Sequence, residues 1–79
     1  MTDTVKKSKV ELAVNHNDDA FELAVRFKAV VAAMGTHTSV YSYHFLGSRC
    51  DVPHGDDAEA ATRKAIVGFV YQLGRVEDD

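Results

Sequence analysis

The sequence has little of several features that mark specialised proteins. Its 79 residues contain one cysteine, one proline and no tryptophan. A single cysteine cannot form an internal disulfide, which agrees with a reducing compartment. The longest apolar run, Ala29 to Met34, is far shorter than the roughly 20 residues that cross a membrane. The first residues, MTDTVKKSK, lack the apolar stretch of a secretory signal. We therefore expect a cytoplasmic protein with no membrane partner.

No large excess of charge of one sign is present either. Nine basic residues against twelve acidic ones give a formal net charge of −3. Proteins that bind nucleic acids directly usually carry a positive surplus, because phosphate neutralisation supplies much of their affinity. We expect no direct nucleic-acid binding. An acidic surface suits a partner with a basic surface.

The hydrophobic fraction of 46% is sufficient for one small folded domain. We predict a flexible basic arm over residues 1–7, a single α/β domain over residues 8–75 and an acidic tail over residues 76–79. Residues 8–15 alternate Val10, Leu12 and Val14 with polar or small residues, which predicts a strand.

The segment from Asp18 to Met34 fits two periods. Its apolar residues alternate as in a strand, but Leu23 and Phe27 also share one face of a helix. An acidic start, many alanines and Gly35 at a C-terminal cap position favour the helix. We predict a helix here.

The second half repeats this order of elements. Residues 36–46 are rich in Thr, Val, Tyr and Phe and predict a strand covered on both faces. Residues 47–55 are interpreted as a loop. Residues 56–73 predict a helix that begins at Asp56 and Glu59 and ends before Gly74. The expected fold is α+β, a β-α-β-α domain of two strands and two helices.

A two-stranded sheet is marginally stable alone, so we expect a homodimer to complete it. Tyr41, Tyr43 and the outer side of the helix over residues 56–73 are the expected interface. Tyr71 and Val67 lie off the main apolar stripe of that helix and leave an apolar patch to cover.

Few residues indicate chemistry. Cys50 and His54 have the spacing C-x3-H, and His44 precedes them, but a zinc site needs three or four converging ligands. We interpret them as loop residues without a metal or cofactor. Because no nucleophile motif or phosphate-binding loop is present, we expect no enzymatic activity. Tyr41, Tyr43 and Phe45 could stack on bases, but without nearby Arg and Lys they favour a core or interface role.

Two runs resemble parts of known families. THTSVYSYHFLG followed by HGDDAEAATRKAIVGFVYQL resembles the strand and alanine-rich helix that end a double-stranded-RNA-binding domain. That family places phosphate-binding lysines at the helix start, where this chain has Asp56 and Asp57. GDDAEAATRKAI also resembles the helix start of HicB-type antitoxins. These resemblances imply an antitoxin-like or regulatory module that acts through protein and nucleic acid.

In size and composition the chain resembles small phage-encoded inhibitors, including type I anti-CRISPR proteins. That resemblance implies stoichiometric binding to a nucleic-acid-binding defence complex in the host cytoplasm, and it carries over no residue. We expect such an inhibitor, acting through an acidic surface. The candidate binding residues are Asp51, Asp56, Asp57, Glu59, Tyr41, Tyr43 and Tyr71.

Overall fold

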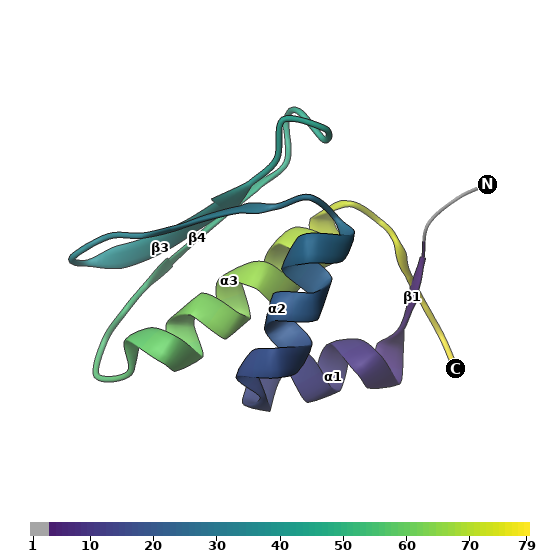
Figure 1. Ribbon diagram of the computed structural model, residues 1–79, viewed down its shortest axis with the longest axis horizontal. Helices are drawn as coiled ribbons and strands as arrows, with labels where there is room; N and C mark the ends of the chain where they lie inside the picture. Colours follow the sequence, from purple (N-terminus) through teal and green to yellow (C-terminus); the bar gives the residue numbers. More distant parts are fainter. Residues whose placement is uncertain (1–3) are drawn as a thin grey trace.

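A helix separates a three-stranded sheet from two further helices in the computed structural model, which describes residues 4–79 (Figure 1). The elements are β1 (Val5–Lys6), α1 (Lys7–Asn15), α2 (Asn17–Arg26), β2 (Val30–Ala33), β3 (His37–Tyr41), β4 (Arg49–Pro53), α3 (Ala58–Gln72) and β5 (Val76–Glu77). Strands β2, β3 and β4 form an antiparallel sheet in that order, and β1 pairs with β5 in parallel. The predicted α+β class is confirmed. The predicted layout of two strands and two helices is wrong.

Helix α1 occupies the segment for which we predicted a strand. Its buried side chains are Val10 and Ala13, with Val14 packed against the core, whereas Leu12 is half exposed. The buried positions are therefore three or four residues apart, as in a helix. A nine-residue segment with three alternating apolar residues fits both periods, and packing selects the helix.

Helix α2 is shorter than the predicted helix over residues 18–34. The chain leaves the helix at Lys28, whose φ of 55° lies in the left-handed region. The N–H of Lys28 donates to the carbonyl of Val25, and the N–H of Ala29 donates to that of Ala24. This pair of bonds is a Schellman ending, which usually has glycine in the left-handed position. The residues that follow form β2 instead of further helical turns.

The predicted loop over residues 47–55 contains β4. Cys50 and Val52 are partly buried and pack against the core, while Arg49, Asp51 and Pro53 point outward. The loop prediction was wrong. The segment has the period-two pattern of a strand, but it is short, lies between Gly47 and Gly55 and contains Pro53, and these residues are typical of loops. The preceding strand, β3, ends at Tyr41 rather than at Leu46.

Helix α3 confirms the prediction of a helix in this segment that ends before Gly74. Its N-cap is Asp57 rather than Asp56, and the Asp57 carboxylate accepts a 3.0 Å hydrogen bond from the N–H of Ala60. Gly74 has a φ of 68°, as expected of a glycine that ends a helix. Phe69 is fully buried at the centre of the core.

The two ends of the described chain lie side by side (Figure 1). Val5 is buried, and the Lys6 ammonium lies 3.1 Å from the Glu77 carboxylate. Residues 5–6 of the predicted flexible arm and residues 76–77 of the predicted tail are therefore held in place, because they pair with each other and Val5 is buried. Residues 1–3 of the predicted arm lie outside the described residues. None of the helices within residues 4–79 combines the length and apolarity needed to cross a membrane.

Candidate functional site

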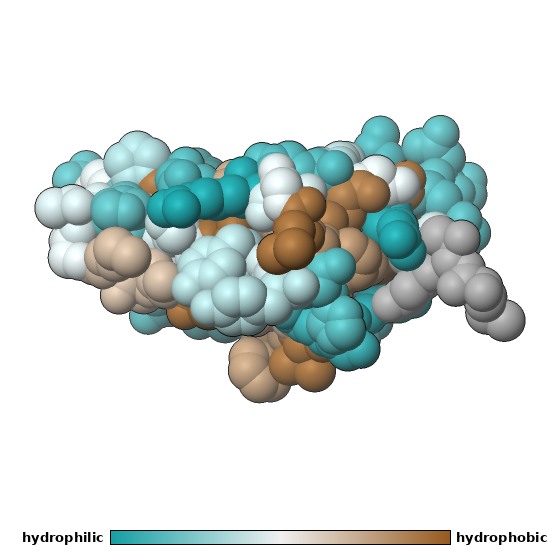
Figure 2. Space-filling view, turned by 90° about the horizontal axis from the view of Figure 1, so that it is seen from above, coloured by the Kyte–Doolittle hydropathy of each residue, from teal (hydrophilic) through white to brown (hydrophobic). Residues whose placement is uncertain are grey.

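The three-stranded sheet has one face against α3 and one face without a covering helix in residues 4–79 (Figure 1). On the covered face, the Thr38 hydroxyl lies 2.8 Å from the Thr62 hydroxyl of α3. Side chains alternate between the faces of a strand, so Ser39 and Tyr41 point to the other side. Ser39 is nevertheless fully buried, because the Arg49 and Asp51 side chains lie against it, so the predicted cover on both faces holds at the centre of β3 and not at the exposed Tyr43. Figure 2 looks onto this uncovered side, most of which is hydrophilic or neutral.

Two tyrosines lie together at one end of the uncovered face. Tyr41 is the last residue of β3 and pairs with Arg49 of β4. The ring of Tyr43 meets the ring of Tyr41 edge-on, with the centroids 5.9 Å apart. Tyr43 is 77% exposed. Such a pair offers an aromatic surface with two hydroxyl groups for hydrogen bonding.

A polar network lies beside the tyrosines. The Ser39 hydroxyl donates a hydrogen bond to the Asp51 carboxylate, and the Arg49 guanidinium donates to the same carboxylate at 3.0 and 3.2 Å. The hydrogen bond from Ser39, followed by the contacts with Arg49, lowers the pKa of Asp51 below its ordinary value. Asp51 is therefore ionised at neutral pH, with its carboxylate held in one orientation.

The other predicted binding residues lie elsewhere. Asp57 caps α3, and Asp56 precedes it in an exposed turn. The Glu59 carboxylate accepts a 2.9 Å hydrogen bond from the side-chain amide of Asn17. Tyr71 is half exposed near the other end of α3. The structure thus groups Tyr41, Tyr43 and Asp51, and it does not place all four predicted acidic residues on one surface.

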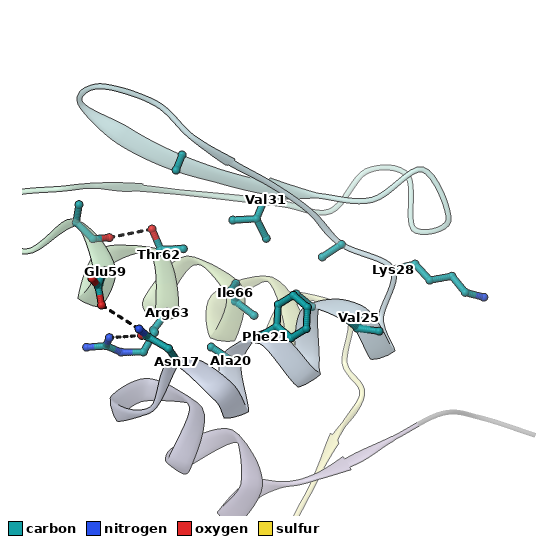
Figure 3. A pocket seen from close by; sticks show the side chains of 14 residues that line it. Asn17, Ala20, Phe21, Val25, Lys28, Val31, Glu59, Thr62, Arg63 and Ile66 are labelled. Atoms are coloured by element: carbon teal, nitrogen blue, oxygen red, sulfur yellow. Dashed lines mark hydrogen bonds between the residues drawn. The ribbon is translucent and has the colours of Figure 1, made fainter.

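An apolar groove of about 620 Å³ lies between α2, α3 and the edge strand β2 (Figure 3). Phe21 and Val25 of α2 form one wall and are 70% and 61% exposed. Val31 of β2 forms the opposite wall, and Ile66 of α3 lies at the base. Our sequence analysis missed this groove. The available signal was that Phe21 and Val25 are apolar although they lie off the face that Leu23 and Phe27 define.

The two ends of the groove differ in charge. At one end, Arg63 donates a 2.6 Å hydrogen bond to Asn17, which in turn binds Glu59. Two further carboxylates, those of Asp18 and Asp19, belong to the first turn of α2 at this end. Lys28 lies at the other end, where α2 gives way to β2.

The possible metal ligands do not converge. Along an extended strand, Cys50 and His54 are separated by roughly 13 Å, because each residue adds about 3.3 Å. The His54 ring lies 2.8 Å from the Thr38 hydroxyl, and the Cys50 thiol lies against Gly68 of α3. Burial, and then the charge of Asp51, raise the pKa of that thiol. Residues 4–79 contain no group of three or more His, Cys, Asp or Glu side chains arranged to hold a metal ion. The prediction that Cys50 is a loop residue is wrong.

Comparison with known proteins found no relative of this chain. The chain matches no family model, and no curated protein or solved structure matches it.

Proposed function

We propose that this chain is a non-enzymatic protein-binding domain and that the uncovered sheet face is its binding surface. The observation that supports this most strongly is the edge-on pair of Tyr41 and Tyr43 next to the ordered Arg49–Asp51 ion pair. Tyrosine and arginine are enriched at protein interfaces, because each combines a large contact area with hydrogen-bonding groups. The hydrogen bonds of the Asp51 carboxylate with Ser39 and Arg49 hold part of this face in place before binding, which lowers the entropy cost of association.

The proposed partner is a subunit of a host nucleic-acid-binding defence complex, as for an inhibitor of the anti-CRISPR kind. This proposal is supported by the size of the chain, its net charge of −3 and the ionised Asp51 on the uncovered face. A basic surface on the partner would be attracted over long range by the net negative charge of the chain.

Affinity capture from a bacterial lysate tests the proposed function. The bait is the tagged wild type, and the matched variants are Tyr43→Ala on the uncovered face and Leu12→Ala on α1. Both replaced side chains are exposed, so both variants should fold. We expect the wild type and Leu12→Ala to retain the same effector subunit and Tyr43→Ala to lose it.

The same experiment separates the alternative. Retention of a toxin or of DNA would favour an antitoxin-like or regulatory module instead. Equal retention of one protein by all three baits would reject the uncovered face as the binding surface.

A further inference from the structure

We infer that a second copy of this chain covers the apolar groove, through antiparallel pairing of β2 with β2 of the other copy. The pairing would join the two three-stranded sheets into one continuous sheet. It would also bring the groove walls of the two copies together beneath that sheet. This interface is separate from the uncovered face to which we assign partner binding.

The first argument is the contrast between the two edges of the sheet. Strand β4 forms one edge and carries Arg49, Asp51 and Pro53 on its outer side. Charged residues and proline are the usual means by which an edge strand avoids pairing with another chain. Strand β2 forms the other edge and contains only valine and alanine, in the sequence Val30–Ala33. Only the β2 edge is therefore open to strand addition.

The second argument is the apolar surface beside that edge. Phe21 and Val25 project from α2 next to β2, and they are the most exposed large apolar side chains of α1, α2 and α3. The close-up in Figure 3 shows them facing Val31 across the groove. A strand added to β2 would place every second side chain over this groove, because side chains alternate along a strand.

Strand geometry limits how two copies can pair. Directly opposite residues of antiparallel strands point to the same side of a sheet. Val31 lies on the groove side, so it must face Val31 or Ala33 of the other copy, which share that side. A two-fold axis perpendicular to the sheet satisfies this condition and sets the helices of both copies on one side.

Charge complementarity favours a second copy over an unrelated segment. At one end of the groove the carboxylates of Asp18, Asp19 and Glu59 outnumber the guanidinium of Arg63, and at the other end lies Lys28. Antiparallel pairing places the Lys28 end of each copy near the acidic end of the other. The same attractive contact then occurs twice, as a two-fold axis requires.

Light scattering over a concentration series tests this inference. The wild type should show twice the monomer mass of 8.7 kDa at micromolar concentration. Val31→Lys should raise the dimer dissociation constant at least about tenfold, because two ammonium groups would face one another near the axis. Leu12→Lys is the matched control, since it adds the same charge at an exposed apolar position of α1. It should leave the dimer intact.

Hydrogen exchange gives a second measurement that does not depend on a variant. Amides of β2 should exchange more slowly as concentration rises, while those on the outer edge of β4 should not change. If Val31→Lys fails to fold by circular dichroism, Phe21→Glu at the exposed groove wall replaces it. A wild type that stays monomeric overturns the inference. So does a dimer that Val31→Lys leaves unchanged. Either result leaves the uncovered-face proposal to its own test.

Discussion

The thiol of Cys50 on β4 lies directly over Gly68 of α3, so that a Cβ added to this glycine would be 2.6 Å from the sulfur. Glycine within a helix costs roughly 1 kcal/mol relative to alanine. Here that cost is offset by the close approach of helix and sheet, which positions the strand bearing Arg49 and Asp51.

We predict that Gly68→Ala lowers the free energy of unfolding by about 1–3 kcal/mol, because the new methyl group overpacks the contact with the sulfur. In a Cys50→Ala background the same change should instead raise it, since the nearest remaining side-chain atom, the Cβ of residue 50, is 3.7 Å away. Urea denaturation of the four variants measures this. An equal effect of Gly68→Ala in both backgrounds would contradict the contact.

Lys28 holds the left-handed position that ends α2. We predict that Lys28→Gly raises the free energy of unfolding by about 1 kcal/mol, because glycine adopts this conformation without a steric penalty. Lys64→Gly, inside α3 and also exposed, should lower it by a similar amount. Thermal unfolding of both variants checks the opposite signs. Two losses of stability would show that Lys28 is not strained.

The Ser39 hydroxyl is the main cause of the lowered pKa of Asp51. A carboxyl group whose pKa is lowered by folding stabilises the protein at pH values above its unfolded-state pKa of about 3.9. This stabilisation is lost as the pH falls through the lower pKa of the folded state. Ser39→Ala should therefore raise the pKa of Asp51. Its stability difference from the wild type should shrink below about pH 4. NMR titration of the Asp51 carboxyl carbon measures the first effect, and an unchanged pKa would reject the role of Ser39.

Phe69 is fully buried, whereas Tyr71 on the same helix is half exposed. Phe69→Ala should cost about 3–5 kcal/mol, since it removes a large buried side chain and leaves a cavity. Tyr71→Ala should stay within about 1 kcal/mol, as is usual for surface positions. Chemical denaturation compares the two variants. Similar losses would place the core elsewhere.

The sequence was most informative where local signals agreed. Helix α3 has a capping aspartate, a wide apolar stripe and a terminal glycine, and all three indicate the same element. The cap was misplaced by one residue, because Asp56 and Asp57 are adjacent and chemically equivalent. The prediction that Val67 belongs to an uncovered apolar patch was wrong, since Val67 is buried in the core.

The other elements depend on tertiary structure. Leu12 continues an alternating pattern yet lies on the outer side of α1, so the pattern alone could not identify a helix. Lys28 ends α2 without a glycine, and residues 30–33 become an edge strand because β3 pairs with them. The placement of Asp51 on the same face as Tyr41 follows from the pairing of β3 with β4. No spacing in the sequence indicates it.

The most direct test of the proposed function is the affinity of the purified partner for three forms of the chain. Surface-based binding kinetics would compare the wild type, Tyr43→Ala and Leu12→Ala, with circular dichroism to confirm that each is folded. Loss of a central interface tyrosine should weaken binding at least about tenfold, mainly through faster dissociation. Leu12→Ala should bind like the wild type. Equal affinities of Tyr43→Ala and the wild type would contradict partner binding through the uncovered sheet face.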